Sequence, residues 1–272
     1  DVIVREINSA PVEDAFFDLD GPERSIVRRD AVESTVRFVE AYPGHENADV
    51  VLGAAVDDMY DMQEFERAIT YAHRLIESYP SADLPIRRAA WTVIAHSSFD
   101  LAAYPQAEDA YIRVLAMTGD EDEGRPALID NLAASIYKQA EQANLLEDYR
   151  AAAGHFLRIK TVAPTSKIRS GAEYDAAAAL MKLEDWSMAS DVLEEFRTSH
   201  PEHELGADAT KQLAYIYRKD GQTARSAPPA SATTASTAHA SRHGDESSRS
   251  TTGMCVPIAI TNNGTVKAAA SP

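Results

Sequence analysis

One spacing of residues recurs along the chain and limits the folds that it can adopt. An aromatic residue is followed by alanine three positions later, by a medium-sized residue four positions further on, and by proline after eight more. Three copies are complete: Phe65-Ala68-Ala72-Pro80, Tyr149-Ala152-Phe156-Pro164 and Trp186-Ala189-Leu193-Pro201. A fourth copy, Tyr104-Ala107-Tyr111, has Gly119 in place of proline, and the aromatic positions recur after 39, 45 and 37 residues.

This spacing predicts a helix that packs closely on a neighbour and then ends. Offsets of three and four residues place side chains on one helical face. Alanine lets a second helix approach, and proline ends the helix because it lacks the N–H group and restricts the residue before it. Upstream, Ala31 and Pro43 keep the same 12-residue separation with Arg28 in place of the aromatic, so we expect a partial copy there.

A second apolar helix is expected before each copy, across a short polar turn. These first helices are predicted over Val50–Tyr60, Ile86–Phe99, Pro126–Leu146, Ile168–Leu183 and Ala207–Lys219. The third is enlarged, so it should protrude or bend the stack locally. The fifth is followed by Ser226-Ala227-Pro228-Pro229 instead of a second helix.

The repeating unit resembles the tetratricopeptide repeat (TPR), which is about 34 residues long. Ala95 with Ala107, and Ala177 with Ala189, occupy that family's two small positions, whereas Val56 departs from the pattern. The resemblance covers about residues 25–224. It implies an all-α fold: a right-handed α-solenoid of antiparallel helix pairs, with four full units and a partial unit at each end. The endings Ala41-Tyr42-Pro43, Ser78-Tyr79-Pro80 and Ser199-His200-Pro201 resemble bacterial envelope members of the family.

The two ends of the chain differ from the repeats. Residues 1–24 are expected to form an irregular lead-in whose Phe16 and Phe17 pack on the first helix. Residues 225–272 are rich in Ser, Ala and Thr, a composition that predicts a disordered tail, with a marginal hairpin at Ile258–Lys267. Because a solenoid usually ends in a polar capping helix, we expect that truncation or an altered reading frame cut a longer array here. The start at Asp1 without methionine likewise indicates a processed product or a fragment.

Charge and composition restrict the partners. The whole chain carries a net charge of −17, and residues 1–224 hold 22 basic against 41 acidic residues, a net charge of −19. The negative charge of residues 1–224 repels the phosphate backbone of nucleic acids, so we expect no nucleic-acid partner. No apolar run is long enough for a membrane span, and the single cysteine, Cys255, lies in the tail. Periplasm or outer membrane is the expected location, with cytoplasm as the alternative; the oligomeric state is left open.

The sequence carries no sign of catalysis or of a cofactor. Nucleotide-loop, nucleophile-elbow and zinc-protease motifs are absent. His200, His203 and Glu204 invite a metal interpretation, but they surround Pro201 in a loop and are expected to be solvated. The acidic run Asp120–Glu123 lacks the spaced ligands of a calcium loop. We therefore predict no catalytic, metal-binding or cofactor-binding residue.

The family resemblance places ligands in a concave groove lined by the first helix of each pair. The matching positions select Tyr60, Thr92, His96, Phe99, Tyr137, Tyr174, Lys182, Lys211, Tyr215 and Arg218. Their aromatic rings would supply contact area, although they can equally pack between helices. The charges of the face run from acidic to basic, which would orient an extended peptide. The lysine–asparagine pair with which some members hold a terminal carboxylate is absent, so that mode of binding is not predicted.

Three functions remain open from the sequence. The first is a non-catalytic scaffold that binds a protein or peptide in the groove, in a bacterial envelope complex. The second is a structural spacer in a longer repeat protein. The third is a regulatory part of an enzyme complex whose active part lies outside this chain.

Overall fold

The computed structural model describes residues 21–219 and 221, with side chains from Ile26 onward. All regular structure in this part of the chain is helical. The helices are α3 (Gly21–Ala41), α4 (Ala48–Asp61), α5 (Phe65–Ser78), α6 (Leu84–Asp100), α7 (Tyr104–Ala116), α8 (Arg125–Leu145), α9 (Tyr149–Val162), α10 (Arg169–Lys182), α11 (Trp186–Ser199) and α12 (Gly206–Lys219). The chain divides into two units, residues 1–228 and 229–272, and every described helix belongs to the first.

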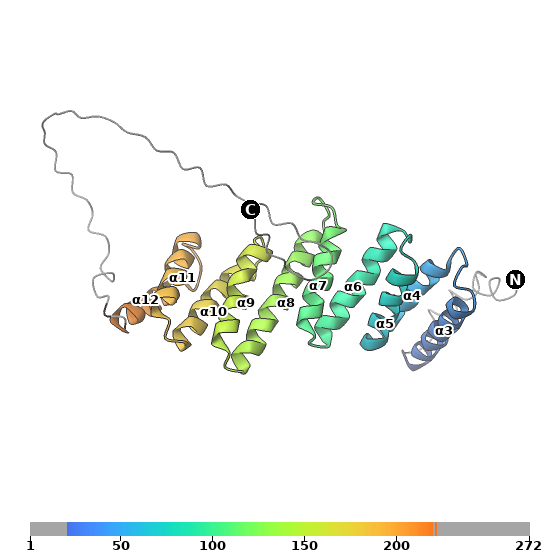
Figure 1. Ribbon diagram of the computed structural model, residues 1–272, viewed down its shortest axis with the longest axis horizontal. Helices are drawn as coiled ribbons and strands as arrows, with labels where there is room; N and C mark the ends of the chain where they lie inside the picture. Colours follow the sequence, from blue (N-terminus) through green and yellow to red (C-terminus); the bar gives the residue numbers. More distant parts are fainter. Residues whose placement is uncertain (1–20, 220, 222–272) are drawn as a thin grey trace, which may run out of the picture. The chain divides into compact units, whose positions relative to one another are not determined.

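The helices form a solenoid of pairs in chain order (Figure 1). Each helix packs against the next, and α4 also contacts α6, as α8 contacts α10. We call α4, α6, α8, α10 and α12 the first helices, and α3, α5, α7, α9 and α11 the second helices. The predicted all-α repeat solenoid is confirmed, with four pairs flanked by the single helices α3 and α12 in the part of the chain that is described.

Four of the second helices begin at the aromatic residue of the repeat pattern: Phe65, Tyr104, Tyr149 and Trp186. The alanine three residues later is fully buried in each of them, at positions Ala68, Ala107, Ala152 and Ala189. Where proline closes the pattern, the helix ends two residues before it, because the residue preceding proline is held in a non-helical conformation. That residue has φ between −133° and −124° at Tyr79, Ala163 and His200.

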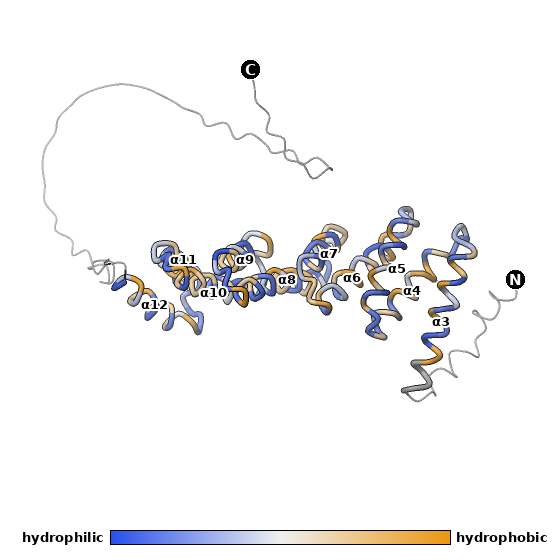
Figure 2. The backbone as a smooth tube through the Cα atoms, turned by 60° about the horizontal axis from the view of Figure 1, so that its bottom comes forward, coloured by the Kyte–Doolittle hydropathy of each residue, from blue (hydrophilic) through white to orange (hydrophobic). Residues whose placement is uncertain are grey.

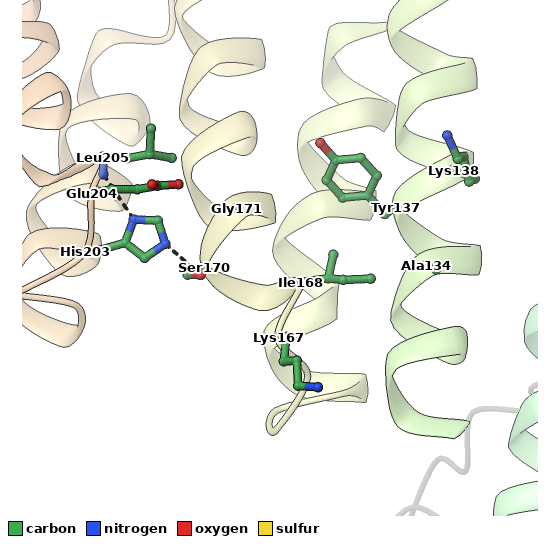
Figure 3. A pocket seen from close by; sticks show the side chains of 10 residues that line it. All are labelled: Ala134, Tyr137, Lys138, Lys167, Ile168, Ser170, Gly171, His203, Glu204 and Leu205. Carbon is green, nitrogen blue, oxygen red and sulfur yellow. Dashed lines mark hydrogen bonds between the residues drawn. The ribbon is translucent and has the colours of Figure 1, made fainter. Parts of the chain in front are cut away.

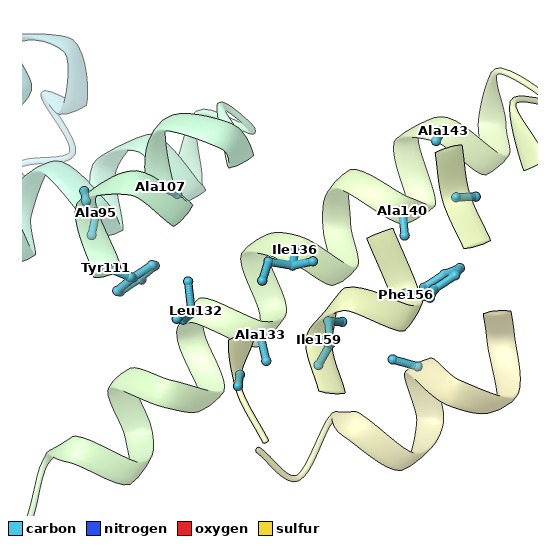
Figure 4. Packing of buried hydrophobic residues seen from close by; sticks show 14 of the residues in the cluster. Ala95, Ala107, Tyr111, Leu132, Ala133, Ile136, Ala140, Ala143, Phe156 and Ile159 are labelled. Atoms are coloured by element: carbon cyan, nitrogen blue, oxygen red, sulfur yellow. The ribbon is translucent and has the colours of Figure 1, made fainter. Parts of the chain in front are cut away.

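The core runs without interruption from one pair to the next. Apolar and hydrophilic residues are interspersed along the helices (Figure 2), and each helix from α3 to α12 contributes apolar side chains to one buried cluster. Figure 4 shows Leu132 and Ile136 of α8 between Tyr111 of α7 and Phe156 of α9, all of them buried. The small side chains Ala133 and Ala140 on the same helix are also fully buried. A core assembled from neighbouring pairs in this way is typical of repeat proteins.

Each turn from a first helix to a second helix has the same backbone conformation. The residue two positions after the helix end has positive φ: 60° at Gln63, 57° at Ala102, 59° at Glu147 and 56° at Glu184. Its N–H and the next N–H bond back to the helix; Gln63 donates to Tyr60 O at 2.8 Å and Glu64 to Met59 O at 2.9 Å. This is the Schellman motif, in which glycine is usual. After α12 the equivalent residue is Gly221, with φ of 68°.

Two details correct or refine the expected repeats. In α3 the pattern is displaced by one residue: Ala31, expected at the small buried position, is exposed, whereas Val32 and Val36 are buried. The enlarged third unit is α8, with 21 residues. Its additional turns lie at its N-terminal end, where Asp130 accepts hydrogen bonds from Ser166 Oγ at 2.8 Å and Lys167 N at 3.0 Å. The extension therefore supports the loop before α10.

The predicted lead-in over residues 1–24 overlaps the start of α3 at Gly21, and the remainder lies outside the described residues. Phe16, Phe17 and the predicted hairpin at Ile258–Lys267 lie there too. The expected disordered tail and the expected cut in the array stay predictions.

Candidate functional site

The five first helices are joined by side-chain hydrogen bonds into one surface, which we call the first-helix face. Tyrosine hydroxyls make three of these links, each to an aspartate on the next first helix: Tyr60 to Asp100, Tyr137 to Asp175 and Tyr174 to Asp208. The remaining step is bridged by Gln142 of α8, whose Nε2 donates to Ala102 O after α6 at 3.4 Å. Every neighbouring pair of first helices is thus connected.

These links give three of the predicted groove tyrosines a structural role. Burial raises the pKa of Tyr174 to about 12, and the hydrogen bond to Asp208 adds to the effect. The pKa of Tyr137 is also raised, by burial and then by its hydrogen bond to Asp175. Burial and Asp100 raise the pKa of Tyr60 as well. Each of these hydroxyls therefore stays protonated and donates to a carboxylate within the protein.

The predicted groove residues of α6 also form hydrogen bonds or ring contacts with other residues of the protein. Thr92 Oγ1 donates to Arg88 O within the helix, at 2.9 Å. His96 lies between Tyr60 and Tyr111, with ring centroids 5.9 and 5.7 Å away, and burial lowers its pKa. Phe99 packs edge-on against Tyr104 at 5.2 Å. This part of the face is more a packing layer than an open groove.

An open pocket of about 490 Å³ lies between α8 and α10 (Figure 3). Its walls include Tyr137 and Lys138 of α8, Lys167 and Ile168 before α10, and His203 and Leu205 before α12. In Figure 3, Tyr137 and His203 lie on opposite sides of the first turns of α10. The His203 ring is held by Ser170 Oγ at 3.1 Å and by Leu205 N at 3.2 Å. The lining combines apolar side chains with two lysines, Lys138 and Lys167, and the carboxylate of Glu204.

A second pocket, of about 260 Å³, lies between α10 and α12. Its walls are Ala178, Met181, Lys182, Trp186, Gln212 and Tyr215. The Trp186 and Tyr215 rings meet edge-to-face with centroids 6.1 Å apart. Lys182 Nζ lies 4.7 Å from the centre of the Tyr149 ring. Tyr215 is 40% exposed and so remains available for contact with another molecule.

The remaining predicted groove residues, Lys211 and Arg218, are exposed on α12. Lys211 Nζ lies 3.7 Å from Asp208 Oδ1, and Arg218 Nε donates to Ala214 O at 3.2 Å. The structure therefore gathers Lys182 and Tyr215 in one pocket and places Tyr137 in the other. Tyr60, Thr92, His96, Phe99 and Tyr174 line neither of them.

His200 and His203 are half-buried and have partners within the protein, so the expectation that they are solvated is wrong. His200 Nε2 lies 3.0 Å from Glu173 Oε2, a carboxylate on a residue only 5% exposed that also accepts from Arg169 Nε at 2.8 Å. In the described part of the chain, no group of three His, Cys, Asp or Glu side chains is arranged to bind a metal. Nor does a helix of residues 21–219 have the length and apolar character to cross a membrane.

Sequence reasoning missed three residues of this face. Asp175 and Asp208 anchor the tyrosine links, and Trp186 lines a pocket although it begins a second helix. No sequence pattern around the two aspartates indicates their role, because only the packing of adjacent helices brings them to the tyrosines. The position of Trp186 directly after a first helix is the one clue that the sequence offered.

The repeated pair, the shared turn and the linked first helices define the class: an α-solenoid of helix–turn–helix repeats. The tetratricopeptide-repeat family model matches residues 57–82, which run from the last turn of α4 to the loop after α5. The same helix pair recurs through α11, so the likeness to tetratricopeptide-repeat proteins extends beyond the matched residues in the described part of the chain. Comparison with curated proteins finds no match.

Several solved structures resemble the chain at low identity. YrrB, described as a TPR protein with an unusual peptide-binding site, is 15% identical and has a TM-score of 0.35, covering 70% of this chain and 86% of its own. BtubC (BKLC) from P. vanneervenii is 14% identical, with a TM-score of 0.35 over 77% and 87% of the two chains. The TPR2AB domain of yeast Sti1, in complex with pHSP90, is 17% identical, with a TM-score of 0.30 over 76% and 88%. The fold assignment does not depend on these likenesses.

Proposed function

We propose that the chain is a non-catalytic scaffold that binds a segment of a partner protein on the first-helix face. The observation that carries this proposal is the position of the two pockets between neighbouring first helices, where they include Tyr137, Lys182 and Tyr215. Exposed tyrosine offers a large contact area with few rotatable bonds, together with a hydroxyl for hydrogen bonding. The best place for a partner is therefore the α8–α12 part of the face.

The spacer function is the second candidate, and one observation favours it. Tyr60, Tyr137 and Tyr174 use their hydroxyls to join first helices to each other, which a purely structural array also needs. The location in a bacterial envelope complex is supported by the repeat endings alone and remains part of the proposal.

Selection from a random peptide library displayed on phage, with the full chain as bait, tests the scaffold function. The selected peptides are synthesised and their affinities measured by fluorescence anisotropy. Truncating a partner-binding aromatic removes contact area, so Tyr215→Ala should weaken binding by about tenfold, equivalent to about 1.4 kcal/mol. Tyr215→Ala is preferred to Tyr174→Ala, because the Tyr174 hydroxyl also holds α12 in place.

Ile112→Ala on α7 is the matched control. Ile112 is 45% exposed, close to the exposure of Tyr215, but it lies on a second helix. Peptides should bind this variant as they bind the original chain. If no peptide is selected, or if Tyr215→Ala and Lys182→Ala bind as well as the control, the spacer function is favoured instead.

A further inference from the structure

The last residue of each first helix occupies an equivalent position along the array. Each lies two residues before the positive-φ residue of the turn, at Gln63, Ala102, Glu147, Glu184 or Gly221. We call this set the terminal row; in chain order it consists of Asp61, Asp100, Leu145, Lys182 and Lys219. All five side chains are exposed. The row therefore changes from acidic through apolar to basic.

The acidic end keeps an excess of negative charge. Arg28 contacts Asp58 at 3.2 Å and Asp61 at 3.3 Å, so one guanidinium serves two carboxylates. Asp57, on the same turn of α4, has its pKa raised by burial and then by the charges of Asp61 and Asp58. Within the described part of the chain, Asp100 accepts a hydrogen bond from the neutral hydroxyl of Tyr60 at 3.4 Å and forms no ion pair. A cationic side chain would be attracted to this end of the row.

At the basic end, the two terminal lysines lie over aromatic rings, and no carboxylate of residues 26–219 forms an ion pair with either of them. Lys182 Nζ lies over the Tyr149 ring at 4.7 Å, and Lys219 Nζ over the Tyr215 ring at 5.7 Å. An aromatic face attracts a cation through its quadrupole but carries no net charge. The two ammonium groups therefore remain available to a carboxylate.

Leu145, in the middle of the row, is 83% exposed at a position where the other four first helices have a charged residue. Leu146, which follows it, is 81% exposed. Of its equivalents, Leu101 is 38% exposed, whereas Met62 and Leu183 pack against the core. Two adjacent leucines left in water retain the hydrophobic driving force for contact with another apolar side chain. The middle of the row thus differs in chemistry from both of its ends.

We propose that the terminal row docks an extended protein segment that carries basic residues at one end, an apolar residue in the middle and acidic residues at the other end. This inference rests on the scaffold function proposed above and specifies the chemistry of its partner. Among the first helices, α4 contacts α6 and α8 contacts α10. Helices packed in this way lie about 8–10 Å apart, and an extended chain advances about 3.3 Å per residue. The segment should therefore present one matching side chain about every three residues.

Three synthetic peptides test the proposal against the full chain. The first has the order Lys-x-x-Lys-x-x-Leu-x-x-Glu-x-x-Glu with serine at each x, and the second is the same sequence reversed. The third has the same composition with its Lys and Glu residues alternating. Binding is measured by fluorescence anisotropy at low salt, because exposed charges are strongly screened as the ionic strength rises. We expect at least one ordered peptide to bind about tenfold more tightly than the alternating one.

Charge reversal on the protein identifies the row as the site. Asp61→Lys combined with Asp100→Lys should lower the affinity of the preferred ordered peptide by about tenfold or more. Adding Lys182→Glu and Lys219→Glu reverses the whole row, so this variant should prefer the ordered peptide that the original chain binds less well. Leu145→Ser should weaken binding severalfold, whereas Ile112→Ser on the exposed surface of α7 should not. Circular dichroism checks that each variant keeps its helical content.

Equal affinity for the ordered and alternating peptides, or affinities unchanged by reversal of the row, would overturn this proposal. The scaffold function would survive that result if library-selected peptides still depended on Tyr215. If no peptide of either kind binds the first-helix face, the row and the scaffold function fail together.

Discussion

At the scale of single residues, the turns after the first helices contain local strain. Gln63, Ala102, Glu147 and Glu184 adopt positive φ. For a residue with a Cβ atom this conformation costs about 1–2 kcal/mol, which is why glycine is usual at such positions. The Schellman hydrogen bonds and the packing of the following helix hold these residues in place.

Replacing Ala102 with glycine should therefore stabilise the protein. The side chain is exposed, so the substitution removes strain without removing core packing. Glycine gains freedom in the unfolded chain, which offsets part of the benefit, and we expect a net gain of about 0.5–1 kcal/mol. Chemical denaturation followed by circular dichroism measures this difference.

Ala103→Gly provides the control in the same loop. Ala103 has φ of −85°, so glycine there relieves no strain and should leave the stability unchanged or lower. An Ala102→Gly variant no more stable than Ala103→Gly would show that positive φ at this turn is not strained.

The residues that set helix ends were predictable from the sequence, and the strained turn residues were not. Phe65, Tyr149 and Pro164 act through local rules, since aromatic spacing follows the helical period and proline ends a helix. Gln63 and Glu147 have no preference for positive φ. Their conformation is imposed by the packing of the two helices, which single-residue propensities do not contain.

At the scale of helices, one ion-pair network joins α7, α8 and α9. Arg158 of α9 makes a bidentate contact with Glu108 of α7, with Nη2 donating to Oε2 at 2.7 Å. Gln139 of α8 donates to the same carboxylate at 2.6 Å. The Glu108 side chain is only 12% exposed, so its charge depends on these donors.

This network should make stability depend on pH. Burial opposes ionisation of Glu108, but the hydrogen bonds and charge of Arg158, with Gln139, hold its pKa below the usual 4.5. A carboxyl group whose pKa is lowered by folding adds stability above its unfolded pKa and loses it as the pH falls through the folded value. Glu108→Gln should cost about 1–3 kcal/mol at pH 7, and the difference from the original chain should shrink below about pH 4.5.

The unfolding free energies of the two proteins, measured from pH 7 downward, test this expectation. The pKa of His155 is lowered by burial and by Arg158, while the charge of Glu108 acts to raise it. Glu108→Gln therefore also changes the titration of His155, so the test of Glu108 itself is the change in the difference below about pH 4.5. Glu40→Gln breaks the exposed pair with Arg74 at 3.3 Å and should change stability by less than about 1 kcal/mol. A Glu108→Gln difference that stays constant with pH would exclude an ionised Glu108 as the cause.

At the scale of the whole array, the stacking of pairs was predictable but the links along the first-helix face were not. The repeated Ala and aromatic positions required helices to pack in chain order. The hydrogen-bond partners of Tyr137 and Tyr174 depend on how one helix is rotated relative to the next. The repeat pattern does not predict this rotation. The predicted groove therefore lies on the helices that these links join, and several of its aromatic residues have partners within the protein.

The tyrosine–aspartate links should stabilise the array locally, because each joins only neighbouring first helices. The Tyr174 hydroxyl donates to Asp208 and accepts from Gln212, both on α12. Tyr174→Phe removes both hydrogen bonds and leaves the ring against Phe196, with which its centroid distance is 5.9 Å. A hydrogen bond to a charged group contributes about 1.5–3 kcal/mol, so amides of α12 that exchange by local opening should exchange at least about tenfold faster.

Hydrogen exchange followed by mass spectrometry of peptic fragments shows which helices exchange faster in the variant. In Tyr174→Phe the fragments of α12 should exchange faster, while those of α4 and α5 stay unchanged. Tyr60→Phe removes the link between α4 and Asp100 of α6. In this variant the fragments of α4 and α5 should exchange faster, while those of α12 stay unchanged. If both variants accelerated exchange equally in all helices, the chain would unfold as one cooperative unit, and the links would contribute to global stability instead of coupling nearest neighbours.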